Sequence, residues 1–358
     1  TPRPITSCLG RSIISYWRGM KVIFWGTPKF SLPTLNAISD SEHEVLAVVT
    51  QPDKRRSRGN ILSPSPVKKR ALELGLNVFT PQDIRKQDDI QQQIYNLNAD
   101  IYIVVAFGQL LPIQVLNQPP LGCWNSHASL LPRWRGAAPI QRCLMAGDSF
   151  TGVGIMAMEK GLDTGPILME HKVAVDLLEN ADELAKRLSL ISGNLIVEAL
   201  HKIESAGPGS ENHRFSLLRP RQQCETKQEA VYARLIDKID TKIEWNQSCI
   251  EIHRKVMGVY PHAFTYYKGK RLKILSTVPL VEEAEKYIDE YLPKNNSILS
   301  VKYNEPGIIM SIDKSYGLII SALDSYVLVK EAQLEGKKAL NGIRLAQQFN
   351  LCVGDKLE

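Results

Sequence analysis

Short apolar runs that alternate with amphipathic stretches are the feature that most constrains how this chain can fold. Residues 21–25, 45–50 and 101–106 are β-branched or apolar and are bounded by Gly, Pro or polar turns, as buried strands are. Residues 66–74 and 88–97 lie between them and have helical apolar spacing. This alternation predicts an α/β fold with a doubly wound, mostly parallel sheet of Rossmann-like type. Ligands of such sheets bind outside the carboxyl ends of the strands.

The pattern changes after residue 206. A further strand at 153–158 leads towards Asp163, and a long amphipathic helix at 181–203 would finish the first domain. Residues 207–226 contain a Gly-Pro-Gly-Ser stretch and basic residues, which is typical of a linker. Beyond them, short strands are expected at 264–267, 271–275, 307–312, 317–321 and 326–332. We therefore expect a first domain at 20–206, a linker at 207–226 and a small β-barrel domain at 227–358.

Composition agrees with a folded two-domain protein. The chain has 358 residues, of which 44% are hydrophobic and 23% charged, so it is long enough for two cores and too apolar to be disordered. No apolar run is long enough to span a membrane. A net charge of +6 favours an anionic partner where the charge is clustered. One such cluster contains Lys54, Arg55, Arg56, Arg58, Lys68, Lys69 and Arg70. It predicts contact with a polyanion, against the simpler alternative of a solvated charged surface.

Polar side chains alternate in one segment directly after a strand-like stretch. In an extended backbone Asn125, His127 and Ser129 share a face, and Pro132 and Gly136 then turn the chain into a loop. An amide and an imidazolium can both donate to an oxygen that becomes negative in a tetrahedral intermediate. A well-placed donor of this kind contributes roughly 3 to 4 kcal/mol to catalysis. The segment therefore predicts chemistry at a carbonyl centre.

A carboxylate is expected beside this imidazole. Asp163 lies between Gly161 and Gly165, so its carboxylate could approach the imidazole of His127 closely, orient the ring and take up a proton. Taken alone, an aspartate between glycines is more often a turn residue. The prediction that Asp163 is catalytic depends on the upstream segment.

The cysteines and glycines weigh against several other classes of protein. The six cysteines form no Cys-x-x-Cys motif and are not paired close to histidines, which argues against a zinc site and against a disulfide framework. Unpaired cysteines of this kind favour a reducing compartment. Gly26 is not followed by the second and third glycines of a dinucleotide-binding loop, so a nicotinamide enzyme is disfavoured.

A serine hydrolase built on Ser129, His127 and Asp163 is a further alternative, but the sequence lacks the nucleophile-elbow motif. A purely RNA-binding module would leave the Asn125, His127 and Asp163 set without a role.

Several segments together resemble the formyltransferases that use 10-formyltetrahydrofolate. Residues 125–141 with 161–165 resemble the catalytic signature of that family. Residues 22–28, 50–66, 104–108 and 335–338 resemble further family segments. Among these, the Gln-Pro-Asp loop at 51–53 and the Pro-Ser-Pro element at 64–66, together with the C-terminal portion, point to the branch that acts on initiator tRNA. The signature differs slightly at Ser126 and Ala128, which are small enough to preserve the geometry.

The resemblance implies a specific activity. A formyl group would pass from 10-formyltetrahydrofolate to the free amine of initiator methionyl-tRNA, for translation initiation, without a metal or an obligate protein partner. A formyltransferase acting on a small amine is the nearest alternative, and the basic loop and second domain argue against it. The family's catalytic residues fall on Asn125, His127 and Asp163. The implied folate contacts are Phe107, Gly108, Ser129, Leu130, Leu131 and Pro132. The expected tRNA contacts are Lys54, Arg55, Arg56 and Arg58, and the second domain would be an OB-like barrel that helps to hold tRNA.

Residues 1–19 stand apart from the rest of the sequence. They contain three arginines and no acidic residue, and the first strand begins directly after Met20. We interpret them as a leader or an extension upstream of a start at Met20, which fits a cytoplasmic protein of bacterial type. The alternative is a transit peptide, which would place the protein in a mitochondrion or plastid.

Overall fold

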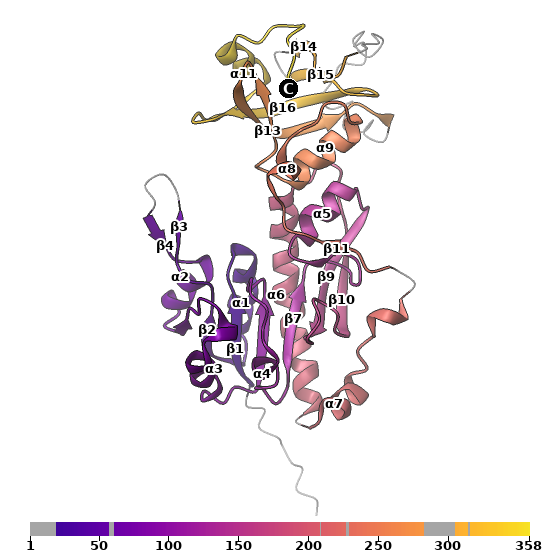
Figure 1. Ribbon diagram of the computed structural model, residues 1–358. Coiled ribbons are helices and arrows are strands. Elements are labelled where there is room, and N and C mark those ends of the chain that lie inside the picture. The colour runs from indigo at the N-terminus through magenta and orange to yellow at the C-terminus, as the bar shows by residue number, and fades with distance from the viewer. Residues whose placement is uncertain (1–18, 57–60, 208, 227–228, 283–304, 314–315) are drawn as a thin grey trace, which may run out of the picture.

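The computed structural model describes residues 19–56, 61–207, 209–226, 229–282, 305–313 and 316–358. Almost all of the expected leader and Arg58 lie outside these ranges. In Figure 1 an α/β domain forms the lower part of the molecule and an antiparallel β domain lies above it. The long helix α6 (Ala181–Ala206) begins near the junction and runs down through the lower domain to its far end.

A seven-stranded sheet forms the centre of the lower domain, in the order β10-β9-β7-β6-β1-β2-β5. Strands β5, β2, β1, β6 and β7 run parallel to one another, and β9 pairs antiparallel with both β7 and the edge strand β10, which confirms the mostly parallel sheet. The strands are β1 (Lys21–Gly26), β2 (Glu44–Val49), β5 (Asn77–Phe79), β6 (Ile101–Val105), β7 (Cys123–His127), β9 (Phe150–Ala157) and β10 (Ile167–Ala174).

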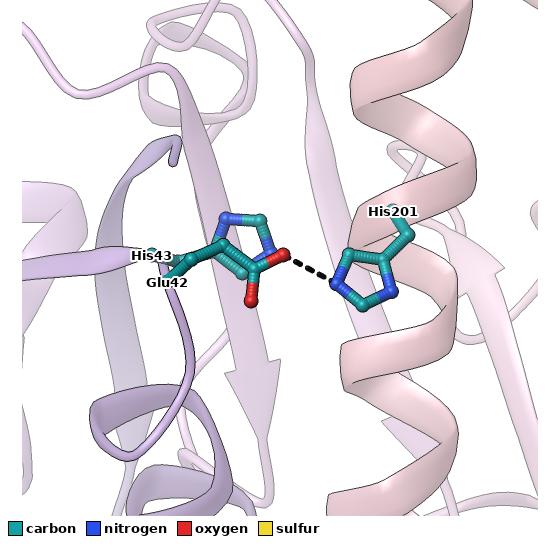
Figure 2. A group of neighbouring side chains, drawn as sticks. All are labelled: Glu42, His43 and His201. Atoms are coloured by element: carbon teal, nitrogen blue, oxygen red, sulfur yellow. Dashed lines mark hydrogen bonds and ion pairs between the residues drawn. The ribbon is translucent and has the colours of Figure 1, made fainter. Parts of the chain in front are cut away.

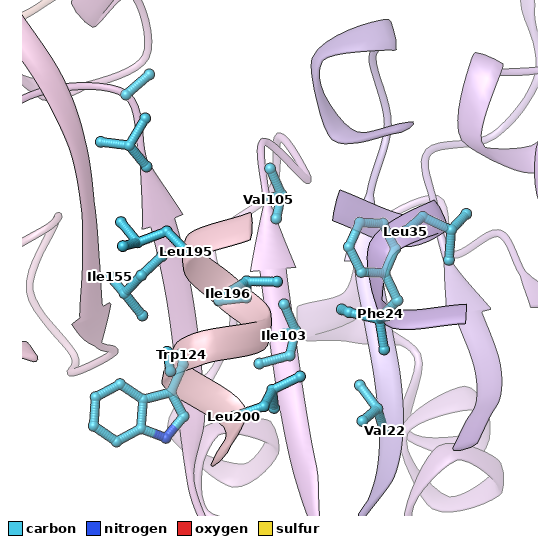
Figure 3. Close-up of a cluster of buried hydrophobic side chains, with 14 of the residues drawn as sticks. Val22, Phe24, Leu35, Ile103, Val105, Trp124, Ile155, Leu195, Ile196 and Leu200 are labelled. Atoms are coloured by element: carbon cyan, nitrogen blue, oxygen red, sulfur yellow. The ribbon is translucent and has the colours of Figure 1, made fainter. Parts of the chain in front are cut away.

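Side chains of the central strands are buried on both faces of this sheet. In β1, Val22 and Phe24 pack into one cluster with helix α6, whereas Ile23 and Trp25 pack into a second cluster on the opposite face. Figure 3 shows the first cluster, where Leu195, Ile196 and Leu200 of α6 lie against the strands. Because both faces are covered, the strands read as continuous apolar runs in the sequence.

Helices cover the two faces as the sequence predicts. Helix α6 begins with a capping box in which the Asn180 side chain accepts from the Glu183 backbone and the Glu183 carboxylate accepts from the Asn180 backbone. No helix among the described residues is long and apolar enough to cross a membrane. The other helices of this domain are η1 (Lys29–Ser31), α1 (Leu32–Ser39), α2 (Pro66–Glu73), η2 (Ile84–Lys86), α3 (Asp88–Tyr95), α4 (Ile113–Leu116) and α5 (Pro139–Ala146).

The upper domain is an antiparallel sheet in the order β12-β13-β16-β15-β14, with β17 paired to β16. Its two edge strands are joined by the chain segment 355–358. The Glu358 N–H donates to Tyr266 O in β12 at 2.9 Å, and the Ile309 N–H in β14 donates to Asp355 O at 2.8 Å. This segment closes the sheet into a barrel. The elements are α8 (Lys238–Thr241), α9 (Cys249–Gly258), β12 (Phe264–Tyr267), β13 (Lys270–Pro279), β14 (Ile309–Asp313), β15 (Gly317–Ser321), β16 (Tyr326–Leu334), β17 (Ala339–Asn341) and α11 (Gly342–Phe349).

The segment between the domains, for which a linker was expected at residues 207–226, contains regular structure within this range and just after it. It forms α7 (Glu211–Leu218), η3 (Gln223–Glu225) and β11 (Tyr232–Ala233). Ser210 starts α7, because its side chain accepts from the His213 N–H. In Figure 1 the segment turns at the bottom of the α/β domain and climbs along its flank to β11 before it reaches the barrel.

Two buried polar contacts fix the barrel to the α/β domain. Arg142 in α5 forms an ion pair with Asp240 in α8 at 2.6 Å, and its hydrogen bonds hold the pKa of Asp240 at about 2. His253 in α9 is fully buried and its Nε2 lies 2.7 Å from Leu177 O, between β10 and α6. Burial lowers the pKa of His253 to about 4, so at neutral pH the ring is uncharged and donates one hydrogen bond to that carbonyl.

Candidate active site

Strand β7 carries two of the expected catalytic side chains. Asn125 and His127 are two residues apart in an extended strand and therefore lie on the same face of the sheet. The intervening Ser126 points to the other face, where its hydroxyl lies 2.6 Å from that of Ser192 in α6. Because β7 is parallel to β6 and β1, His127 lies at the carboxyl edge of the sheet.

The ring of His127 has one defined hydrogen bond. Its Nε2 lies 2.9 Å from Trp134 O, and since a carbonyl oxygen only accepts, Nε2 carries a proton. The other nitrogen, Nδ1, lies 3.7 Å from Asp163 Oδ2. The side chains of His127 and Asp163 are only 7% and 13% exposed, so their interaction is little screened by solvent. The structure thus brings together the imidazole and the carboxylate that the sequence predicted.

Asp163 lies in the turn between β9 and β10 and is held from several sides. The Gly136 N–H donates to its Oδ2 at 2.8 Å, and Asn125 Nδ2 lies 3.5 Å from its Oδ1. Its backbone has φ +51°, in the left-handed region that a non-glycine residue adopts only where its surroundings impose it. Asn125, His127 and Asp163 therefore form one polar group contributed by separate parts of the chain.

The loop from Ser129 to Gly136 has a fixed shape. The buried Ser129 hydroxyl donates to Arg133 O at 2.7 Å, so Ser129 supports the loop and is not aimed at His127 as a nucleophile. Arg133 and Trp134 both donate to Asp148, at 2.7 Å each. Burial alone would raise the pKa of Asp148, but these hydrogen bonds outweigh it and hold the pKa below its usual value. A serine hydrolase is not supported by this geometry.

Gly136 allows the loop from Ser129 to Gly136, which we call the catalytic loop, to lie very close to the interdomain segment. It lies in β8 (Arg135–Gly136), which pairs in parallel with β11. Its φ is +111°, and a Cβ at this position would lie 3.0 Å from Ala233 O. Only glycine fits both the backbone conformation and the space. The N–H that binds Asp163 is thus held in place by β11.

The expected folate residues all lie at the carboxyl edge, but not all present side chains there. Phe107 is buried against Trp25, with 5.2 Å between ring centroids, and Leu131 is buried with Met156 and Ile167. Gly108 is exposed, and its carbonyl accepts from Gln51 Nε2 at 2.9 Å. The remaining three expected contacts are within the catalytic loop: Ser129 and Pro132 are buried and Leu130 is partly buried. Gln51 lies in a segment that resembles the family but was not among the expected site residues, because its side-chain partners are 56 and 57 residues away.

The expected tRNA-contacting segment forms a hairpin of β3 (Lys54–Arg56) and β4 (Ile61–Ser63). In Figure 1 it projects from the α/β domain on the side towards the barrel. Lys54 and Arg55 are exposed, Arg56 pairs through its backbone with Ile61, and Arg58 lies outside the described residues.

The downstream part of the basic cluster is partly neutralised. Lys68 forms an ion pair with Asp53 at 2.8 Å, and Arg70 donates to Asn36 at 2.8 Å and to Glu73 at 3.3 Å. Lys69, in the same part of the cluster, is exposed, so the described residues that offer exposed basic charge are Lys54 and Arg55 of the hairpin together with Lys69.

A second group of histidines and a carboxylate lies where α6 passes the start of β2. Figure 2 shows Glu42 between His43 and His201, with Glu42 Oε1 2.6 Å from His201 Nε2. Three ligand atoms lie close enough to hold a metal ion. However, the Met20 N–H donates to His43 Nδ1 at 3.1 Å, so Nδ1 is the acceptor nitrogen of the ring. In the neutral form of His43 the single ring proton is therefore on the other nitrogen, Nε2, which is buried. That nitrogen has no free lone pair for a metal, and burial further lowers the pKa of His43. We interpret the group as an ion pair beside a buried neutral histidine.

Comparisons with known proteins show the family to which both domains belong. Residues 20–200 match the model for the formyl transferase domain, and residues 235–350 match the model for the formyl transferase C-terminal domain. A methionyl-tRNA formyltransferase of Prochlorococcus marinus (strain MIT 9313) is 50% identical over 94% of this chain and 98% of its own length. One of Synechococcus sp. (strain RCC307) is 51% identical over 92% of this chain and 100% of its own length. Both relatives are bacterial.

Solved structures share the fold at much lower identity. HypX from Aquifex aeolicus superposes with a TM-score of 0.59 at 15% identity, covering 94% of this chain and 49% of that protein. A sugar 3N-formyl transferase, solved in the presence of dTDP and 5-N-formyl-THF, has a TM-score of 0.57 at 17% identity and covers 89% of this chain and 99% of its own. At this identity they show the arrangement of elements alone.

Proposed function

The chain belongs to the formyl transferase family, and on that premise we propose that it transfers a formyl group from 10-formyltetrahydrofolate to the free amine of initiator methionyl-tRNA. The observation that carries this conclusion is its identity of about one half to methionyl-tRNA formyltransferases, over nearly the whole length of both chains. The grouping of Asn125, His127 and Asp163 at the carboxyl edge of the sheet supports the chemistry.

The proposed reaction is a direct transfer. The amine attacks the formyl carbon, the carbonyl oxygen becomes negative, and the bond from that carbon to the folate nitrogen then breaks. Asn125 Nδ2 and a protonated His127 Nδ1 donate to the oxyanion. Asp163 faces both groups, so it stabilises the imidazolium and assists the proton that passes from the amine to the folate nitrogen.

The loop around the site orients these groups. Trp134 O fixes the ring of His127 through Nε2, so Nδ1 is the nitrogen left to face the reaction. The folate would lie against the backbone of residues 129–132 and the corner at Phe107 and Gly108. Because Phe107 and Leu131 point into the core, we propose that they contribute shape and backbone groups rather than direct side-chain contacts.

The acceptor is proposed to approach from the side of the β3–β4 hairpin. Exposed Lys54 and Arg55 would contact phosphates there, and Arg56 and Arg58 extend the same charge along the sequence. A small amine offers no phosphate backbone for this hairpin, which favours tRNA over the small-amine alternative.

A formylation assay tests the proposal directly. Purified protein would receive 10-formyltetrahydrofolate with charged initiator tRNA, with charged elongator methionine tRNA, or with small amine acceptors. We expect formyl-methionyl-tRNA from the initiator alone at low enzyme concentration. Efficient formylation of a small amine with no product on tRNA would reject the tRNA assignment while retaining formyl transfer.

A further inference from the structure

The side chain of Gln223 occupies an unusual position between the domains. It belongs to η3 in the interdomain segment, yet it is only 4% exposed and lies against the candidate active site. Most glutamines are exposed, and a buried one requires partners for two donors and an acceptor oxygen. Nothing in the proposed chemistry uses this residue directly.

Both ends of this side-chain amide are hydrogen-bonded, and each contact reaches a part of the site. Its Nε2 donates to Asp163 O and to Gly165 O, both at 2.8 Å. Its Oε1 accepts from Arg135 Nη2 at 2.7 Å and Nε at 3.0 Å. The Gln223 side chain thus joins the turn that contains Asp163 to the catalytic loop, in which the Trp134 carbonyl binds the ring of His127.

The backbone of Asp163 needs such support. Its left-handed φ of +51° is costly for a non-glycine residue, by an amount on the order of 1 kcal/mol or more, and persists only when neighbouring contacts impose it. The carboxylate is held through the Gly136 N–H, whereas its main chain is held through Gln223. Gly136 is itself held by β11, so both attachments originate in the interdomain segment.

We propose that Gln223 is a positioning residue that sets the orientation of Asp163 towards His127, and that the interdomain segment thereby completes the catalytic site. The inference deepens the proposed function and rests on it where activity is measured. A displacement of about 1 Å in a catalytic group costs up to about a hundredfold in rate. The same segment continues into the barrel, so a movement of the barrel would reach Asp163 through it.

Two substitutions separate the halves of the amide. Gln223→Glu retains an acceptor for Arg135 but cannot donate to the two carbonyls, while Gln223→Ala removes both. We expect both variants to lose between about tenfold and a hundredfold in kcat, with KM for tRNA and for the formyl donor changed less than about threefold. Gln222→Ala is the matched control, because Gln222 is the adjacent, exposed residue of the same type. It should retain wild-type kcat.

A double-mutant cycle shows whether the effect passes through Asp163. In an Asp163→Asn background, Gln223→Ala should cost less than about twofold in single-turnover rate, since groups that act as one unit are not additive. A full additional loss in that background would overturn the inference and make Gln223 a general stability residue.

Hydrogen exchange gives a measurement that does not depend on the reaction. In Gln223→Ala the amides of residues 161–165 and of Gly136 should exchange faster than in Gln222→Ala, while those of strand β6 should not change. Unchanged exchange would reject the positioning role even if activity falls. If the wild-type protein formylates no tRNA, the proposed function fails, and this exchange experiment still decides whether Gln223 holds the turn.

Discussion

Two groups that each combine histidine with a carboxylate differ in an instructive way. In the surface group, His201 and Glu42 are 2.6 Å apart but are 50% and 52% exposed. In the candidate active site, His127 and Asp163 are 3.7 Å apart and almost fully buried. The shorter distance belongs to the group with no other sign of function. A close ion pair on the surface is readily formed and readily exchanged for contacts with solvent.

The difference lies in what surrounds each pair. Trp134 O defines which nitrogen of His127 carries a proton, and Gly136 and Gln223 hold Asp163 in a costly conformation. Glu42 and His201, by contrast, both present their side chains to solvent, His201 from an exposed turn of α6. Restraint of the partners, rather than their separation, distinguishes the catalytic group.

The largest expected effect comes from removing a donor of the buried group. Asn125→Ala and His127→Ala should each lower kcat about a hundredfold or more, because each removes a group that stabilises the oxyanion. Single-turnover formylation measures the decrease, and circular dichroism confirms that the variant is folded. A folded variant with near-native turnover would remove that residue from the mechanism.

A somewhat smaller decrease is expected for Asp163→Asn. The amide oxygen can still accept from the Gly136 N–H, but the negative charge beside His127 is gone. If Asp163 also carries a proton, kcat should fall nearly as far as in His127→Ala. The double variant should then be hardly slower than either single one, whereas multiplied effects would show that the two residues act independently.

A weaker effect is expected at the exposed β3–β4 hairpin, because its basic side chains contribute only when they contact the phosphates of a bound polyanion. Replacing Lys54 and Arg55 by Ala should raise KM for tRNA and flatten the slope of log affinity against log salt by about two units, one for each phosphate that the variant no longer neutralises. Folate binding should not change. Lys202→Ala, at a residue that pairs with Glu198 on α6, is the control. An unchanged salt slope in the hairpin variant would make the hairpin a solvated surface.

The smallest effect should come from the surface group. Glu42→Gln and His201→Ala should leave kcat and KM unchanged and alter the free energy of unfolding by less than about 1 kcal/mol. Added zinc should not raise the melting temperature of the wild-type protein relative to these variants. Metal-dependent stabilisation that disappears in His201→Ala would contradict our interpretation of the group as an ion pair.

Much of the α/β sheet could be predicted from sequence because its central strands are apolar on both faces. Strand β6, for example, has five consecutive buried residues. Edge strand β10 was not predicted, since Glu170, His171 and Lys172 give it an exposed, polar pattern. Such a strand is specified by pairing with β9 rather than by its own composition.

The same distinction applies to the candidate site. Asn125 and His127 could be placed together because they are neighbours on one strand, where spacing alone determines the face. Asp163 was identified only by association with them. Gln223 was missed because it lies in a polar stretch that reads as a linker, and its hydrogen bond to Asp163 spans 60 residues. Contacts between residues that are far apart in the sequence produce no local sequence pattern from which they could be predicted.

The segment 355–358 has a consequence for how the protein is made. Synthesis on a ribosome proceeds from the N-terminus, so β12 leaves the exit tunnel well before the segment that covers its free edge. The Thr265 hydroxyl and Glu358 O, joined by a hydrogen bond, are 93 positions apart. Until the segment 355–358 is in place, β14 and most of β12 lack a backbone partner on their outer edges, although Ile243 already pairs with Phe264, and such edges can pair with other chains. Released chains that are truncated before residue 355 should therefore be bound by chaperones more strongly than released chains that include residue 358.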